Sequence, residues 1–290
     1  MHGMKITLDC LPCFMKMAVR GARYVAPNDL QKQTEIIQQW NREMAEMDMD
    51  RTAPAIARDM LHTLAKVSGN HDPFREDKDI ANKRVMELLP HLREIVQNSD
   101  DPLATAIEMA IIGNYMDSGA AMECDWEEEL KSLEQNIDPA TYKLFISKLK
   151  PGAKVLILGD NAGEVGIDTL LVDQLQKHGC NVTYAVRSGP ALNDALIEDA
   201  HLVGMTDLCE VVESGADSPG TELSLITDEF RQRMEEADVL LSKGQGNFEC
   251  LFGTWPEIFF AFKVKCSVIV EATGFTLGQS MFIRAEDNHF

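Results

Sequence analysis

The first half of the chain places apolar residues three and four positions apart, which is the period of an amphipathic helix. Ile80, Val85 and Leu92 belong to one such series. The pattern predicts helices over residues 13–24, 30–46, 52–66, 77–98, 101–116 and 125–135. We therefore expect residues 1–147 to form an all-α N-terminal domain.

After Pro151 the pattern changes to short apolar runs rich in β-branched residues, each followed by a stretch of helical period. The predicted strands span residues 154–158, 182–186, 210–212, 239–241 and 267–270, and residues 258–262 fit a helix or a strand equally well. Strands that alternate with helices predict a mainly parallel sheet covered on both faces, hence a three-layer α/β/α domain over residues 148–290. Ligands bind such sheets at the carboxyl ends of the strands, so the residues after each strand are the first candidates for a site.

The 290-residue chain carries 47 acidic and 27 basic side chains, a formal charge of −20. This charge disfavours nucleic acid and anionic membranes as partners, because binding to either requires neutralisation of phosphates. The same field repels a phosphorylated metabolite. An anion site in this protein therefore needs a local positive source, such as a metal ion, a lysine or a helix N-terminus.

Seven cysteines, an odd number, together with the lack of a signal segment or an 18-residue apolar run, predict a cytoplasmic protein without a membrane span. Cys10 and Cys13 have the spacing of half a zinc site or of a redox pair. A second CxxC is absent, so we expect by default a reduced pair packed in the fold. A structural or metal role with a distant ligand such as Cys124 stays open.

Asp160 and Asn161 follow the first predicted strand, ahead of Gly163, Glu164 and a helical stretch. Two oxygen-bearing side chains beside a helix N-terminus suit a hard cation and a phosphate side by side. A helix cap formed by Asp or Asn, with glycine easing the turn, explains the same residues equally well.

Arg187 and Ser188 follow the second strand, and Asn193 and Asp194 are predicted to open the next helix. The guanidinium suits phosphate oxygens, and Asp194 can face Asp160 across the edge of the sheet. Taken alone, this segment is explained at least as well by a helix cap and a surface ion pair.

The fourth strand leads into the segment Lys243-Gly244-Gln245-Gly246-Asn247. An ammonium and backbone N–H groups beside two glycines can approach a phosphoryl group without obstruction by a Cβ atom. The order GxxxxGK[ST] of a Walker A loop is absent, so nucleotide hydrolysis is not indicated. The alternative is a turn eased by glycine that carries a solvated lysine.

Asn114 and Asp117 in the helical half interrupt an apolar run three residues apart, which places both on one helical face. A polar pair after such a run needs hydrogen-bond partners. The two side chains can line the crevice from the other domain, or they can mark a helix end with a capping asparagine.

The segments LGDNAGE, VRSGPALNDA, SGADSPGTELS, KGQGNFE and GNYMDSGA, with the N-terminal LDCLPC, resemble the metal-dependent damage-control phosphatase family, formerly domain of unknown function 89. Their order and spacing resemble its stand-alone prokaryotic branch, which carries the CxxC, over residues 10–274. The resemblance implies an α/β/α fold with an N-terminal helical domain. It also implies hydrolysis of phosphomonoesters assisted by a divalent metal such as Mn, Co, Ni or Mg.

Carried over residue by residue, the resemblance makes Asp160, Asn161 and Asp194 the metal ligands. The resemblance and the strand-end pattern together nominate as substrate contacts Asn114, Asp117, Arg187, Ser188, Lys243, Gly246 and Asn247. Ile112 stands where eukaryotic relatives usually have tryptophan, so the substrate side near it can differ from theirs.

We therefore expect a phosphatase of small metabolites, such as sugar phosphates, phosphorylated cofactor precursors or damaged metabolites, that uses metal-activated water. Its candidate catalytic residues are Asp160, Asp194, Lys243 and Glu164. Lys243, with Arg187 as the weaker candidate, would neutralise charge on the phosphoryl oxygens. Glu164 or Asp117 would orient the attacking water or protonate the leaving oxygen.

Three other interpretations remain at this stage. A carboxylate nucleophile of the haloacid-dehalogenase kind also begins with an Asp after a strand, but that chemistry expects a second Asp where Ala162 stands. The runner-up enzyme is an S-adenosylmethionine-dependent carboxyl methyltransferase, although LGDNAGE lacks the usual glycine-rich loop. The third is a noncatalytic metal-binding protein that uses the acidic surface and the cysteine pair.

Overall fold

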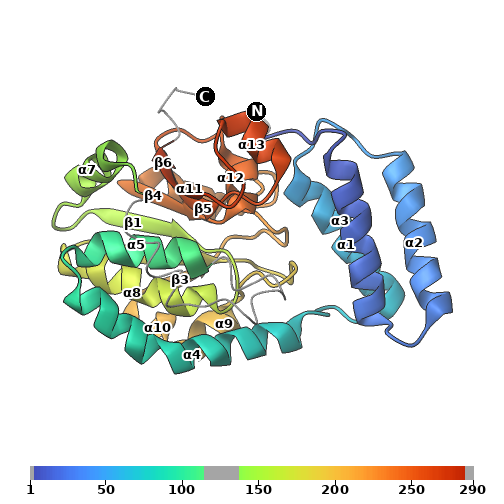
Figure 1. Cartoon of the computed structure of the whole chain (residues 1–290), viewed down its shortest axis with the longest axis horizontal. Coiled ribbons are helices and arrows are strands. Elements are labelled where there is room, and N and C mark those ends of the chain that lie inside the picture. Colours follow the sequence, from blue (N-terminus) through green and yellow to red (C-terminus); the bar gives the residue numbers. More distant parts are fainter. Residues whose placement is uncertain (1–2, 114–136, 285–290) are drawn as a thin grey trace.

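The computed structural model describes residues 3–113 and 137–284 of the chain. At one end three helices pack together, α1 (Cys10–Val25), α2 (Leu30–Ala45) and α3 (Ala53–Ser68) (Figure 1). Their shared core contains buried apolar side chains from each of them: Phe14, Ile36, Trp40, Met60 and Leu64. This bundle agrees with the first three helices that the apolar periodicity predicts.

Local sequence signals set the ends of α3. Its N-cap Thr52 accepts a hydrogen bond from Ala55 N at 3.2 Å, and Pro54 occupies the first turn, where it costs no helical hydrogen bond. Gly69 ends the helix in the left-handed region with a φ of 73°. The Thr52 hydroxyl also donates to Glu222, which ties the start of α3 to the second half of the chain.

The second half of the chain forms a six-stranded sheet with the strand order β3-β2-β1-β4-β5-β6. The strands are β1 (Lys154–Leu158), β2 (Asn181–Val186), β3 (Glu210–Glu213), β4 (Val239–Lys243), β5 (Ile258–Lys263) and β6 (Ser280–Arg284). Neighbouring strands are parallel except for β5 and β6, which are antiparallel. The carboxyl ends of the adjacent strands β2, β1 and β4 therefore meet at one edge of the sheet.

Helices cover both faces of this sheet. They are α4 (Arg75–Asn98), α5 (Pro102–Gly113), α7 (Pro139–Lys148), α8 (Glu164–Lys177), α9 (Ile197–Leu202), α10 (Met205–Leu208), α11 (Asp228–Glu236), α12 (Gln245–Leu251) and α13 (Ser267–Thr273). Val155 and Ile157 of β1 face the core that the sheet shares with α4, α5 and α8. Leu156 and Leu158 face the opposite core, which contains side chains of α11, α12 and α13. The predicted three-layer α/β/α architecture is confirmed.

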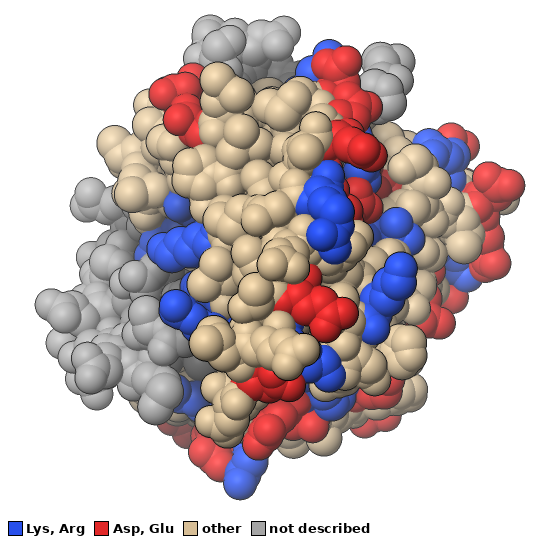
Figure 2. All heavy atoms as spheres, turned by 90° about the vertical axis from the view of Figure 1, so that its right-hand side faces the viewer, with Lys and Arg blue, Asp and Glu red and all other residues tan. Residues whose placement is uncertain are grey.

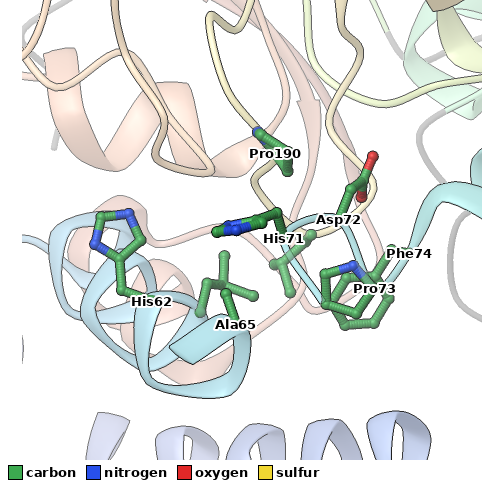
Figure 3. Close-up of a pocket in the computed structure, with 9 residues that line it drawn as sticks. His62, Ala65, His71, Asp72, Pro73, Phe74 and Pro190 are labelled. Atoms are coloured by element: carbon green, nitrogen blue, oxygen red, sulfur yellow. The ribbon is translucent and has the colours of Figure 1, made fainter. Parts of the chain in front are cut away.

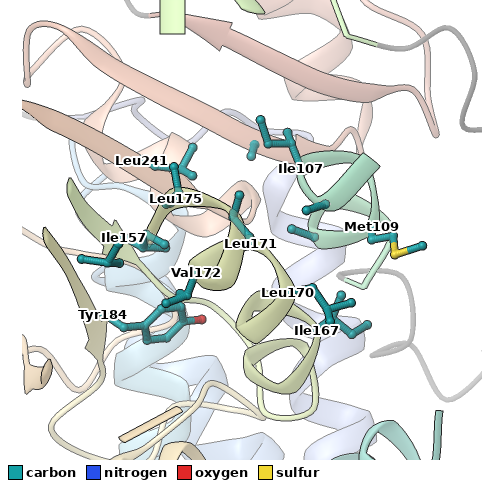
Figure 4. Packing of buried hydrophobic residues seen from close by; sticks show 14 of the residues in the cluster. Ile107, Met109, Ile157, Ile167, Leu170, Leu171, Val172, Leu175, Tyr184 and Leu241 are labelled. Carbon is teal, nitrogen blue, oxygen red and sulfur yellow. The ribbon is translucent and has the colours of Figure 1, made fainter. Parts of the chain in front are cut away.

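The helices of the N-terminal half contribute to two different cores. Ile107 from α5 and Leu171 from α8 belong to one cluster with β-strand residues such as Leu241 (Figure 4). Val85 on α4 also packs on α8, where a Cβ atom at Gly166 would lie only 2.6 Å from it. Thus α4 and α5 cover the sheet, whereas α1, α2 and α3 form the separate bundle. The division into domains at residue 147 stays a prediction.

The far edge of the sheet differs from the predicted pattern. Residues 267–270, predicted as a strand, lie in α13, and the edge strand is β6, which the pattern did not indicate. Gly274 has a φ of 72° and donates from its N–H to Val270 O at 2.8 Å, a helix ending that outweighs the local preference of valine and isoleucine for strands. The ambiguous residues 258–262 form most of β5.

Helix α7 was not among the helices that the sequence pattern predicted. The predicted helix over residues 125–135 lies outside the described residues. Within residues 3–113 and 137–284, no helix combines the length and the apolarity needed to cross a membrane.

Candidate functional site

The β1–α8 connection holds Asp160 and Asn161 at the carboxyl edge of the sheet. Both side chains are buried. Gly159 allows the chain to pass close to β2, because a Cβ atom at this position would lie 2.6 Å from the ring of Tyr184. The sheet thus packs tightly just ahead of the two polar residues.

Asn82 of α4 connects the β1–α8 loop, which carries Asp160 and Asn161, to α9, the helix that follows Asp194 in the chain. Its Oδ1 accepts from the N–H of Gly163 at 2.6 Å, and its Nδ2 donates to Asp199 Oδ1 at 2.8 Å. Asp199 also accepts from Leu196 N at 2.9 Å and from Arg75 Nη2 at 2.6 Å. Nothing in the sequence pattern indicated Asn82, because an asparagine inside a polar helix carries no local signal.

The turn after β2 brings Asp194 beside Asn161, with which it forms an isolated antiparallel bridge. The bridge is extended by Ala195 N, which donates to Asp160 O at 2.8 Å. The prediction that Asn193 and Asp194 open a helix is wrong, since α9 begins three residues after Asp194. Asn193 lies in a turn instead, and pairing with the β1–α8 loop holds Asp194 in an extended bridge.

Arg187 is enclosed at the end of β2, with 2% of its surface exposed. Its Nε donates to Asp194 Oδ2 at 2.6 Å, its Nη1 donates to Thr221 Oγ1 at 3.2 Å, and its Nη2 lies 3.7 Å from Asp160 Oδ1. Burial acts to lower the pKa of Arg187, but the charges of Asp194 and Asp160 outweigh burial and raise it. Two nitrogens of the guanidinium, Nε and Nη1, therefore donate hydrogen bonds, whereas Nη2 is buried without a hydrogen-bond partner among the described residues.

Lys243 is completely buried and joins two acidic residues of α8. Its Nζ donates to Glu164 Oε1 at 2.5 Å and to Asp168 Oδ1 at 2.7 Å, and the Tyr184 hydroxyl donates to Asp168 Oδ2 at 2.7 Å. Burial acts to lower the pKa of Lys243, but the two carboxylates raise it. Burial raises the pKa of Asp168 to about 6, although Lys243 opposes this shift. Asn161 Nδ2 lies 3.3 Å from Glu164 Oε2, which links this ionic group to the candidate metal ligands.

Asp168 and Tyr184 were not among the predicted site residues. The available signal for Asp168 was an acid one turn after Glu164 in the mainly apolar first half of the helix. Tyr184 gave no such signal, since a tyrosine in a strand is ordinary.

Gly244 and Asn247 hold the end of β4 against β1. Gly244 has a φ of +79°, and a Cβ atom there would overlap the Asp160 carboxylate. Asn247 donates from Nδ2 to Gly159 O at 3.0 Å, while its Oδ1 accepts from Thr221 N at 2.7 Å and Thr221 Oγ1 at 2.8 Å. Both ends of this amide are engaged within the fold. A substrate contact of Asn247 stays a prediction.

Ser188 and Gly246 contact neighbouring loops. Ser188 Oγ accepts from Gly215 N at 2.6 Å, and a Cβ atom at Gly246 would overlap Pro219 O. These contacts shape the loops around the site, and the predicted substrate contacts of both residues stay predictions.

One connected group therefore contains Asp160, Asn161, Glu164, Arg187, Asp194 and Lys243. Asn114 and Asp117, the candidates from the helical half, lie outside the described residues. The structure thus brings together the ends of β1, β2 and β4, as the parallel arrangement of strands predicts.

The connected group and its neighbour Asp168 carry more negative than positive charge, with the four carboxylates Asp160, Glu164, Asp168 and Asp194 against the two cations Arg187 and Lys243. Burial, and after it the charges of Asp194 and Glu164, raise the pKa of Asp160 well above its usual value. A divalent cation would offset this excess, and carboxylate and amide oxygens are the ligands that hard cations prefer. The donor set thus fits such a metal.

Acidic residues alone do not complete a metal site here. Within residues 3–113 and 137–284, no three His, Cys, Asp or Glu side chains lie close enough together to hold a metal ion. Asn161, which pairs with Asp194 and contacts Asp160, offers an amide oxygen beside the two carboxylates.

The cysteine pair lies on the first turn of α1. Cys10 and Cys13 are both free thiols, and Cys13 is exposed. The expectation of a packed pair is therefore wrong for Cys13, because the first turn of α1 leaves its side chain at the surface. Cys124, named as a distant ligand, lies outside the described residues.

A hollow lies between α3, the α3–α4 loop and the turn after β2 (Figure 3). His62, His71 and Pro190 are among its lining residues, and His62 Nε2 lies 2.9 Å from Asp217 Oδ2.

On the face of the molecule shown in Figure 2, basic and acidic side chains are interspersed. The net negative charge is thus not gathered into a patch of one sign on this face.

Comparison with known proteins assigns the chain to a family. The model of the damage-control phosphatase ARMT1-like domain matches residues 6–281. A damage-control phosphatase of Archaeoglobus fulgidus is 32% identical, and the match covers 95% of this chain and 97% of the relative. The damage-control phosphatase PH1575 of Pyrococcus horikoshii is 29% identical, with 92% and 93% covered. A crystal structure of PH1575, described as a DUF89 family protein, matches with a TM-score of 0.86 and 26% identity over 98% of this chain and all of the other.

The chain belongs to the damage-control phosphatase ARMT1-like family. This confirms the resemblance that the strand-end motifs indicated, and the crystal structure of the Pyrococcus protein supports the fold. The narrower assignment to a prokaryotic branch with an N-terminal CxxC stays a prediction.

Proposed function

We propose that this protein is a metal-dependent phosphatase that hydrolyses phosphomonoesters of small metabolites. The observation that carries the proposal is the meeting of Asp160, Asn161 and Asp194 at the carboxyl edge of the sheet, inside a group with an excess of buried negative charge. The names of the Archaeoglobus and Pyrococcus relatives support phosphatase activity and a role in removing damaged metabolites. Sugar phosphates and phosphorylated cofactor precursors are the candidate substrates.

In the proposed site, Asp160, Asn161 and Asp194 hold a divalent cation such as Mn, Co, Ni or Mg. When bound, this cation supplies positive charge beside the phosphoryl oxygens and makes water more acidic. Arg187 orients Asp194 through the 2.6 Å hydrogen bond from its Nε. Its charge also limits the repulsion between the two aspartates, so that both carboxylates can stay close together.

Glu164 is the proposed general base that orients the attacking water. As water adds to phosphorus, Glu164 takes one proton from it and the bond from phosphorus to the leaving oxygen breaks. Glu164 then gives that proton to the leaving oxygen, which departs as the alcohol. Lys243 fixes the Glu164 carboxylate through its 2.5 Å contact, and Asp168 fixes Lys243. Direct contact of Lys243 with the phosphoryl group, and contacts of Asn114 and Asp117 with the substrate, remain part of the proposal.

The test is a phosphatase screen over sugar phosphates, phosphorylated cofactor precursors and a chromogenic ester, with each divalent metal in turn. Asp160→Ala should abolish phosphate release, while Asp207→Ala, which removes an exposed acid of α10, should not.

The outcomes of this screen separate the proposal from its rivals. Release that no metal raises above the Asp160→Ala background contradicts the phosphatase. A phosphoenzyme trapped on Asp160 would replace activated water by a carboxylate nucleophile. Tight binding of S-adenosylmethionine without metal would favour a methyltransferase, and metal binding without turnover a noncatalytic protein.

A further inference from the structure

Four buried side chains form a continuous series of contacts behind the candidate site. The ammonium group of Lys243 donates to Glu164 at 2.5 Å and to Asp168 at 2.7 Å. The hydroxyl group of Tyr184 donates to the other carboxylate oxygen of Asp168 at 2.7 Å. Each of the four residues exposes 2% of its surface or less. A tyrosine of β2 is therefore linked to the carboxylate of the proposed general base through one aspartate and one lysine.

Tyr184 packs between the end of β1 and α8. A Cβ atom at Gly159, the residue before Asp160, would lie 2.6 Å from the ring of Tyr184 and 2.7 Å from its hydroxyl oxygen. Figure 4 shows the ring beside α8, with the oxygen directed toward that helix. The phenol therefore lies directly behind the loop that carries the candidate metal ligands, and its surroundings fix the place of its hydroxyl group.

The direction of the hydrogen bond follows from the two ionisable groups. Burial, and after it the charges of Asp168 and Glu164, raise the pKa of Tyr184 well above its usual value, so the phenol keeps its proton and donates it. Burial raises the pKa of Asp168 to about 6, while the charge of Lys243 and the hydrogen bonds from Lys243 and Tyr184 oppose this shift. Asp168 is therefore mainly charged at neutral pH. In the part of the chain that the structure describes, Tyr184 is the one hydrogen-bond donor to its Oδ2.

We propose that Tyr184 is a positioning residue, which holds the Glu164 carboxylate in place through the aspartate and the lysine between them. The inference rests on the proposed function, in which Glu164 is the general base. Lys243 lies between two carboxylates, so the place of its ammonium group depends on Asp168 being fixed as well. A catalytic group must be held within about 0.5 Å of its productive position, and hydrogen bonds from side chains that do not touch the substrate supply this precision.

The test compares Tyr184→Phe with Tyr142→Phe. Phenylalanine keeps the ring that packs against Gly159 and removes only the hydroxyl group. Tyr142 of α7 is the matched control, because its hydroxyl group also donates to an aspartate, Asp101, at 2.7 Å, away from the site. With the metal that best supports wild type, Tyr184→Phe should lower kcat about tenfold and leave KM within about twofold, since the base is displaced and the substrate contacts are not. Tyr142→Phe should change neither constant.

A double-mutant cycle separates positioning from general support of the fold. Asp168→Asn removes the charge through which Tyr184 acts, and it should itself lower kcat. If Tyr184 acts through Asp168, adding Tyr184→Phe to Asp168→Asn should lower kcat by less than about twofold. Losses that multiply in the double variant would mean that Tyr184 supports the fold independently of Asp168, and would overturn the inference. A kcat of Tyr184→Phe equal to that of wild type would overturn it as well.

Failure of the proposed function is recognised separately. Wild type that releases no phosphate with any metal contradicts the phosphatase. In that case, or if Asp168→Asn does not fold, amide hydrogen exchange tests the positioning without turnover. Tyr184→Phe should exchange faster than wild type in residues 160–168, which carry both carboxylates, but not in β3 or β5. Exchange equal to wild type, or faster throughout the sheet, rejects the inference.

Discussion

Replacement of Asn82 by alanine tests whether α4 holds the site loops in place. Asn82 is completely buried, with hydrogen bonds of 2.6 Å from Gly163 N and 2.8 Å to Asp199. Asn82→Ala leaves the Gly163 N–H without its acceptor and removes one of three donors to Asp199. The unpaired Gly163 N–H costs about 1–3 kcal/mol and the lost hydrogen bond to Asp199 about 1 kcal/mol, so we expect a loss of about 2–4 kcal/mol.

Urea unfolding measures this loss as a shift of the midpoint at an unchanged slope. Asn82→Asp keeps an acceptor for Gly163 but puts a second carboxylate beside Asp199, so at neutral pH it should destabilise more than alanine does. Asn181→Ala is the control, because its exposed Nδ2 donates to Gly152 O at 3.2 Å and its loss should stay within about 0.5 kcal/mol. If Asn82→Ala also stays within about 0.5 kcal/mol of wild type, Asn82 does not hold the loops.

Three further variants test other contacts. Gly244→Ala should weaken Mn²⁺ binding in calorimetry, because the new Cβ atom would overlap the Asp160 carboxylate. Gly253→Ala is the control: Gly253 also has a positive φ, but the space around it is open, so this variant should only lose about 1–3 kcal/mol of stability through backbone strain. Lys243→Met should lower the free energy of unfolding in urea by about 3–5 kcal/mol, because it removes the cation that pairs with the buried carboxylates of Glu164 and Asp168. A near-neutral result would contradict this ion pairing. Burial acts to raise the pKa of Asp217, but hydrogen bonds from Arg58 and His62 outweigh burial and lower it. The charged Asp217 therefore stabilises the fold at a pH above the unfolded pKa, and this stabilisation is lost as the pH falls through the folded pKa. Wild type should therefore exceed Asp217→Asn in stability at about pH 6, and the difference should shrink below about pH 4; a difference that grows on acidification would refute this sign.

Much of the fold could be predicted from local patterns. The amphipathic series of the N-terminal half and the β-branched runs after Pro151 reflect backbone periods that depend only on neighbouring residues, and they gave most helices and strands. Residues 267–270 show the limit of this reasoning. Their β-branched side chains favour a strand, but a helix ending at Gly274 and the pairing of β6 with β5 decide the outcome.

The candidate site was predicted only as far as chain direction allows. Asp160, Asp194 and Lys243 each follow a parallel strand, so their positions at one edge followed from the sequence. The partners of the charged groups could not be predicted. The sequence pattern suggested that Lys243 binds phosphate, whereas in the structure its ammonium group is bound to Glu164.

The sequence by itself determined that the polar segments follow strands of one mainly parallel sheet, since strand direction follows from the alternation of strands and helices. The strand order, which places β1 between β2 and β4, came from the structure. Only the tertiary structure decided how these segments are bound. Lys243 and Glu164 are 79 residues apart in the chain, and Asn82 and Gly163 are 81 apart. Pairings over such separations depend on which helix packs on which strand and on the exclusion of water from their contact. No local period records either condition.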